Sequence, residues 1–230
     1  MLIKFLKFLW HRVLRIIGLR LAIQDYKYKG DLELLFLGSA YGGWSLINDP
    51  SLNNGLVVSA GVGEDISFDI EMINKFDTKV ILIDPTPRAI AYFNNVGENF
   101  GCVRGVPYAS CGLQPINSYD LSKSNDQNLK LVPRALWNKT EELKFFEPVD
   151  DANVSHSISN FQSQYNFEAK HILVKADTLK NVLFAMSVQE NISLLKMDIE
   201  GAEHEALESI INDRILPHQI LVDYDELRLT

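Results

Sequence analysis

Short apolar runs and helical apolar patterns alternate along the body of the chain. Apolar runs at 56–59, 80–83 and 192–197 have the length and composition of buried strands. Apolar residues recur at helical spacing over 66–76 and 202–211, directly after the first and the third of these runs. Strands that alternate with helices predict an α/β fold with a parallel sheet.

The pattern is weaker elsewhere in the body. Pro87 favours a helix start, and the helix that follows is predicted to carry Arg88 to Phe93. Another helix is predicted to begin near Thr178. We interpret the loosely patterned segment from 101 to 167 as the third strand region of the sheet plus an insertion over the ligand edge. Further strands are predicted at 130–133, 143–146, 171–174 and 219–225.

A glycine turn and an acidic residue follow the first two strands. Gly61 and Gly63 form a tight turn after the first strand, and Asp84 ends the second, 21 positions beyond Gly63. In a nucleotide-binding βαβ unit such glycines let a ligand approach the backbone, and the acid binds ribose hydroxyls. The third glycine of the dinucleotide fingerprint is absent, which favours an adenosyl ligand without a pyrophosphate. The alternative role for Asp84 is a helix N-cap before Pro85.

A second group of acids lies where the strand at 192–197 ends and the helix at 202–211 begins. It consists of Asp198, Glu200 and Glu203. In open α/β sheets ligands bind at this edge, outside the carboxyl ends of the strands. Glutamates in the first turn of a helix also suit the positive end of its dipole, so a well-capped structural helix is the alternative.

Two other segments carry candidate chemistry. In the loop at 38–44, Gly42 and Gly43 allow close approach of a ligand, but we favour a plain turn in which Trp44 fills the core. His156 lies among hydroxyl side chains and is either a base near neutral pH or a surface histidine.

Charge is distributed unevenly along the chain. The net charge is −8, although residues 1–30 hold seven Lys and Arg against one Asp. The acidic remainder argues against nucleic-acid binding, because it repels phosphate. Cys102 and Cys111 have no metal or redox spacing and indicate a reducing, cytoplasmic compartment. A length of 230 residues accommodates the appendage at 1–30 and one domain at 31–230, with the insertion around 105–168.

The first 30 residues predict a basic amphipathic helix. Lys4, Lys7, His11 and Arg15 recur at steps of three and four and form a narrow basic stripe beside a wide apolar surface. Charges interrupt the apolar run too often for a membrane-spanning helix or a signal peptide. Either residues 1–24 lie in the interface at the inner face of a membrane, or the helix packs on the domain or on a second subunit. The exclusively cationic charge favours the first alternative.

Together these motifs resemble the FkbM-type S-adenosylmethionine-dependent methyltransferases. The resemblance rests on 57–69 around the glycine turn, on 83–87 around Asp84, and on 195–203, where Lys-Met-Asp-Ile-Glu-Gly-Ala-Glu is its most specific part. It covers residues 35–228 and implies the class I methyltransferase fold, a doubly wound, mostly parallel sheet with helices on both faces. It also implies methyl transfer to a hydroxyl of a small molecule or a glycan.

The resemblance assigns roles by position. Ala60, Gly61 and Gly63 are expected to line the methionine end of the cofactor, and Asp84 is expected to hold the ribose hydroxyls. No metal site is predicted.

The resemblance also places Asp198 and Glu200 near the transferred methyl group. They are the first candidates for the base that an alcohol nucleophile needs, and His156 is the next. With the basic N-terminal segment, this suggests a glycan or lipid-linked acceptor at a membrane.

Three features depart from the family pattern. Ser59 stands where many methyltransferases have an acid, which is expected to weaken contact with the cofactor's ammonium group. Asp65 replaces the usual third glycine. The chain ends at Thr230, so the last helix and antiparallel hairpin of the fold are expected to be missing. Two other classes remain open: a non-catalytic cofactor-binding or scaffold protein with an incomplete methyltransferase fold, and an NAD-dependent oxidoreductase.

Overall fold

A central sheet of five parallel strands organises residues 32–146 and 170–224, the part of the chain that the computed structural model describes. Its strands run in the order β10-β9-β3-β4-β5. They are β3 (Leu56–Ala60), β4 (Lys79–Ile83), β5 (Leu129–Val132), β9 (Ile192–Met197) and β10 (Gln219–Val222). The chain proceeds outward from β3 to β5 and then returns to the other side of β3 at β9. The carboxyl ends of β3 and β9 therefore border a topological switch point, where open α/β sheets bind ligands.

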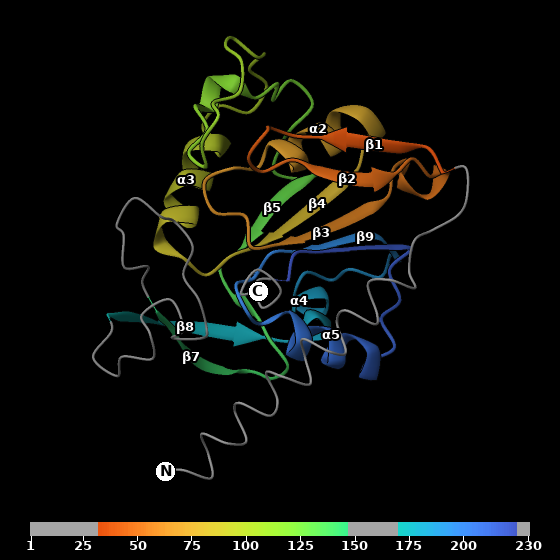
Figure 1. The fold of residues 1–230 in the computed structure, drawn as a ribbon, viewed down its shortest axis with the longest axis vertical. Coiled ribbons are helices and arrows are strands. Elements are labelled where there is room, and N and C mark those ends of the chain that lie inside the picture. Colours follow the sequence, from red (N-terminus) through yellow and green to blue (C-terminus); the bar gives the residue numbers. More distant parts are fainter. Residues whose placement is uncertain (1–31, 147–169, 225–230) are drawn as a thin grey trace, which may run out of the picture.

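Helices cover both faces of this sheet (Figure 1). On one face lie α2 (Ser67–Phe76) and α3 (Pro87–Gly97), and on the other lie α4 (Leu179–Ala185) and α5 (Glu203–Asn212). Alternate residues of each strand enter two separate cores: Val57 of β3 packs on the α2 side, and Val58 packs on the α5 side. Burial on both faces explains why β3, β4 and β9 are mostly apolar along their whole length. The doubly wound α/β fold is confirmed.

A two-stranded hairpin packs beside α2 and β10. It consists of β1 (Leu34–Leu37) and β2 (Trp44–Ile47), paired antiparallel. The side-chain amide of Gln219 on β10 accepts the Ile47 N–H at 3.0 Å and donates to the Ile47 carbonyl at 2.9 Å. The loop at 38–44, predicted as a plain turn, is the connection of this hairpin.

A small three-stranded sheet stands apart from the central one. It has the order β6-β8-β7 and is built from β6 (Ala135–Leu136), β7 (Glu141–Phe146) and β8 (His171–Asp177). The predicted strand at 171–174 belongs to this small sheet, as does the one at 143–146, whereas the one at 130–133 is β5 of the central sheet. Short 3-10 turns, η1 (Pro50–Leu52) and η2 (Ile116–Ser118), complete the described elements.

Local capping sets two of the helix starts. The Thr86 hydroxyl accepts the Ala89 N–H at 3.4 Å at the start of α3, and the Thr178 hydroxyl accepts the Asn181 N–H at 3.2 Å at the start of α4. The N-cap of α3 is therefore Thr86, which corrects the alternative role given to Asp84.

The strongest sequence patterns give accurate element bounds. The strands predicted at 56–59, 80–83 and 192–197 and the helices predicted at 66–76 and 202–211 each lie within one residue of the observed elements. The predicted N-terminal helix over residues 1–30 falls outside the described residues. Among the helices of the described part, none combines the length and the apolar character needed to cross a membrane.

Candidate functional site

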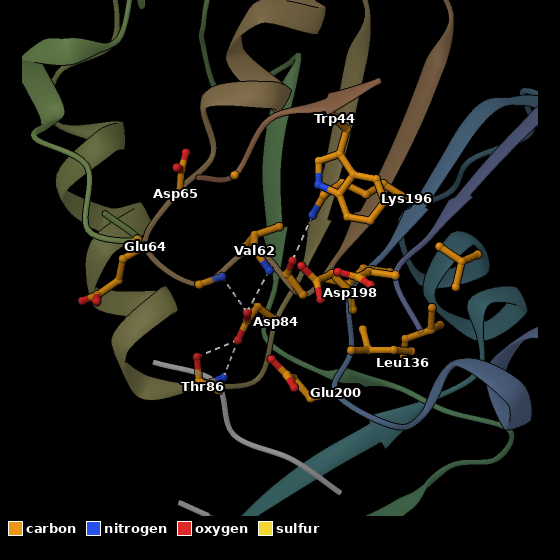
Figure 2. Close-up of a pocket in the computed structure, with 18 of the residues that line it drawn as sticks. Trp44, Val62, Glu64, Asp65, Asp84, Thr86, Leu136, Lys196, Asp198 and Glu200 are labelled. Carbon is orange, nitrogen blue, oxygen red and sulfur yellow. Dashed lines mark hydrogen bonds between the residues drawn. The ribbon is translucent and has the colours of Figure 1, made fainter. Parts of the chain in front are cut away.

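A cavity of about 590 Å³ lies at the carboxyl ends of β3, β4 and β9. This volume is within the usual range for small-molecule sites, roughly 300–1,000 Å³. Figure 2 shows side chains from the glycine turn, from the ends of β4 and β9, and from the hairpin facing this space. Of the predicted site residues, the cavity brings together Gly61, Gly63, Asp84, Asp198 and Glu200.

The turn after β3 depends on glycine. Gly61 has φ +74° and Gly63 has φ +53°. A Cβ on Gly61 would lie 1.7 Å from the carbonyl oxygen of Asp198, so the loops after β3 and β9 touch through backbone at this point. Ala60 is fully buried behind the cavity wall, and its carbonyl accepts the Asp198 N–H at 3.0 Å. The two loops therefore form one backbone surface.

Asp84 is held rigidly at the wall of the cavity. Its Oδ2 accepts the N–H groups of Val62 and Gly63 at 3.1 and 3.0 Å. Its Oδ1 accepts the N–H and the hydroxyl of Thr86 at 2.8 and 2.6 Å. A carboxylate offers about four acceptor positions, so any ligand hydroxyl would share an oxygen that already has donors. The acid at the end of β4 fixes the glycine turn against the start of α3.

The loop after β9 carries Asp198 and Glu200 into the cavity. Glu200 has φ +53° and Gly201 has φ +96°, and these two left-handed residues turn the chain from β9 into α5. A non-glycine residue in this region is strained, and such strain is concentrated at functional sites. Glu203 holds this strained turn in place. Its carboxylate accepts the Ile199 N–H at 3.0 Å and the Gly201 N–H at 3.0 Å, on either side of Glu200.

Glu203 is therefore an anchor of the loop. It is 1% exposed, and burial raises its pKa. Glu203 thus has a structural role, but its hydrogen bonds go to the loop before α5, and the N-cap of α5 has no side-chain hydrogen bond, whereas Asp198 and Glu200 line the cavity. The sequence did not separate these roles, because all three acids occupy one short junction.

Asp65 connects the hairpin to the glycine turn. Its Oδ2 accepts the Ser39 hydroxyl at 2.6 Å and the Gln114 amide at 3.0 Å, and its Oδ1 accepts the Ser67 N–H at 2.9 Å. The Ser39 hydroxyl accepts in turn from the Gly42 N–H at 2.8 Å. The acid in place of a third glycine thus holds the cavity rim and the first turn of α2 together.

Lys196 and Trp44 are two of the cavity residues that were not predicted as site residues. Lys196 of β9 lines the cavity, with its Nζ 5.1 Å from the ring centroid of Trp44. Trp44 packs partly on the core, as expected, but it also lines the cavity (Figure 2). A lysine within a fully buried strand was a usable signal, because lysine is rarely buried without a partner.

Two further predictions concern a metal site and His156. Within residues 32–146 and 170–224, no group of three His, Cys, Asp or Glu side chains is placed to hold a metal ion. His156 falls outside the described residues, so its candidate role as a base stays a prediction.

The sheet order, the glycine turn and the cavity at the switch point define a Rossmann-like protein of the methyltransferase class. A sequence model of the methyltransferase FkbM domain matches residues 49–226, well over half of the chain. The chain belongs to this family of methyltransferases. Comparison with curated proteins and with solved structures finds no match.

Proposed function

We propose that the chain is an S-adenosylmethionine-dependent O-methyltransferase. The observation that carries this proposal is the charge of the cavity beside the glycine turn. Its charged lining residues are six acids and one lysine among the described residues: Glu64, Asp65, Asp84, Asp198, Glu200, Asp223 and Lys196. S-adenosylmethionine carries a sulfonium and an ammonium group, which an acidic wall attracts. The same wall repels a dinucleotide's pyrophosphate, which argues against the oxidoreductase alternative.

The residues of the chain take separate roles in this proposal. Gly61 and Gly63 present backbone to the cofactor, and Asp84 lies at the strand end where ribose hydroxyls bind. Bound S-adenosylmethionine supplies an electrophilic methyl group. Asp198 and Glu200, at the lip of β9, accept the proton of the acceptor hydroxyl.

The acceptor side of the cavity is aromatic. Phe36, Tyr41 and Trp44 line it from the hairpin, and Phe36 and Tyr41 are largely exposed. Aromatic faces pack on apolar ring surfaces while neighbouring polar groups fix orientation. This supports a glycan, lipid-linked or small-molecule acceptor with a ring that bears the hydroxyl.

Calorimetric titration of the full chain with S-adenosylmethionine tests the cofactor. We expect saturable binding, weakened about tenfold or more by Asp84→Ala, because the glycine turn loses the charged hydrogen bonds that hold it and the cavity loses one acid. Asp49→Ala is the matched control, because Asp49 also accepts a backbone N–H, that of Ser51 at 2.8 Å, but lies outside the cavity lining. No binding by the folded chain, or binding of NAD instead, contradicts the proposal.

Methyl transfer separates an enzyme from a non-catalytic cofactor-binding protein. A labelled methyl group is offered with a panel of methyl glycosides and simple cyclic alcohols. Transfer supports the enzyme. Tight cofactor binding without transfer to any member of a broad panel favours the scaffold alternative.

We also propose that residues 1–24 hold the protein at an anionic membrane surface on the cytoplasmic side. The support is the basic stripe with its wide apolar face in the sequence. The full chain should float with phosphatidylserine vesicles, and binding should weaken as salt rises. A chain lacking residues 1–24 should remain unbound, and an equal bound fraction for both chains contradicts this proposal.

A further inference from the structure

Lys196 is a buried cation at the cavity wall. It is 4% exposed and lies on β9, whose six residues are all buried. Its Nζ donates to the carbonyl oxygen of Gly61 at 3.1 Å and lies over the ring of Trp44. The ammonium group is thus held between the glycine turn and the hairpin, facing the space that the cavity residues enclose (Figure 2).

Behind Lys196 lies a buried acid on α2. Asp69 is 1% exposed, and the positive charge of Lys196 is close enough to favour its charged form. Ser59, which pairs in register with Lys196, lies against the same carboxyl group. Burying two opposite charges costs desolvation free energy that their attraction often does not repay, so stability alone does not explain this arrangement. Asp69 is outside the cavity lining, whereas Lys196 is part of it.

Lys196 is a local positive charge in a cavity whose other charged lining residues, among the described ones, are acids, with Asp198 and Glu200 on its own strand end. Asp84 ends β4, and Lys196 is on β9, with β3 between them. Two strand spacings separate these strands by about 10 Å. If the ribose lies at Asp84, as the proposed function has it, the cavity continues from there past the glycine turn to Lys196, which leaves room for the amino-acid end on that side. Among the described lining residues, Lys196 is the only cation on that path.

We propose that Lys196 binds the carboxylate of the cofactor's methionine moiety, an inference that rests on the proposed function. The carboxylate is the only anionic group of S-adenosylmethionine, and a buried ammonium beside the glycine turn attracts it. The amino-acid end of the cofactor is then bound through a charged hydrogen bond from the Lys196 ammonium group to the cofactor carboxylate.

A ligand pair tests the inference without altering the protein. S-adenosylmethionine and its decarboxylated form differ in the carboxylate alone. Calorimetry on the full wild-type chain should give about 10- to 100-fold weaker binding of the decarboxylated ligand, the usual range for a charged hydrogen bond. Equal affinities overturn the inference but leave the proposed function standing. Binding of neither ligand overturns both.

Variants test whether Lys196 causes the preference for the ligand with the carboxylate. Lys196→Met leaves Asp69 buried without its neighbouring cation and is liable to unfold, so the double variant Lys196→Met with Asp69→Asn removes both charges. In the folded double variant the two ligands should bind with equal affinity. The matched control Asp69→Asn keeps Lys196 and should retain the preference. A preference that survives in the double variant contradicts the role of Lys196.

Discussion

At the scale of single residues, Glu203 shows how an acid in a binding loop can act on the loop itself. It lies in the first turn of α5, where a glutamate suits the helix dipole, but its hydrogen bonds go backward to Ile199 and Gly201. These bonds hold the strained backbone of Glu200 in place. The position of Glu200 in the cavity therefore depends on its neighbour.

Glu203→Ala should destabilise the protein by about 2–4 kcal/mol, because two partly buried N–H groups lose a charged acceptor. Glu205→Ala is the matched control, since Glu205 occupies the same helix turn. Its loss should cost about 1 kcal/mol or less, the usual size of a dipole interaction. Chemical denaturation followed by circular dichroism measures both. If the two variants lose similar amounts of stability, Glu203 contributes only through the helix dipole, and its hydrogen bonds to the loop add nothing.

At the scale of elements, the turn after β3 joins two loops by direct backbone contact. The N–H of Gly61 donates to the Ile83 carbonyl at 2.9 Å, so the turn is also tied to β4. Three strand ends thus meet at one glycine. Any side chain there separates the loop after β9 from the turn.

Gly61→Ala should therefore destabilise the protein by several kcal/mol, well beyond the roughly 1 kcal/mol expected from backbone strain alone. Gly101→Ala isolates the strain, because Gly101 has φ +86° and a Cβ there would have no atom within 4 Å. Denaturant midpoints of the two variants give the comparison. Equal midpoints would show that the backbone moves to accommodate a Cβ beside the Asp198 carbonyl oxygen without a measurable loss of stability.

The elements also show which parts of this fold a sequence can predict. β3, β4 and β9 were predicted within one residue because both of their faces are buried, which leaves a continuous apolar run. The hairpin was missed because Leu34 and Phe36 are exposed and its strands are four residues long, so no buried run marks them. The partners of Asp65 lie far along the chain and depend on tertiary packing. Local pattern therefore predicted the strand ends of the site but not its rim.

At the scale of the whole molecule, the buried pair of Lys196 and Asp69 makes stability depend on pH. Burial raises the pKa of Asp69 to about 6 from an ordinary 3.8, and the charge of Lys196 opposes this rise. The folded chain thus holds this proton more tightly than the unfolded chain. The contribution to stability is complete below pH 3.8 and is lost as pH rises through 6.

The free energy of unfolding of the wild-type chain, relative to Asp69→Asn, should fall by about 2.5 kcal/mol between pH 4 and pH 8. The asparagine variant is the reference because it cannot titrate. Asp126→Asn serves as the control for the loss of one carboxylate, since Asp126 is exposed. Denaturant titrations across this range provide the measurement. A constant difference between wild type and Asp69→Asn would show that Asp69 does not titrate there.

The position of β3 in the middle of the sheet has a consequence for how the protein is made. During synthesis β3 can pair with β4 once residue 83 has left the ribosome, but its other edge stays open until β9 emerges, more than a hundred residues later. The hairpin gains its hydrogen bonds to Gln219 later still, because that residue follows β9 in the chain. An unpaired apolar strand edge recruits other strands. The nascent chain therefore exposes an apolar strand edge while more than a hundred further residues are synthesised.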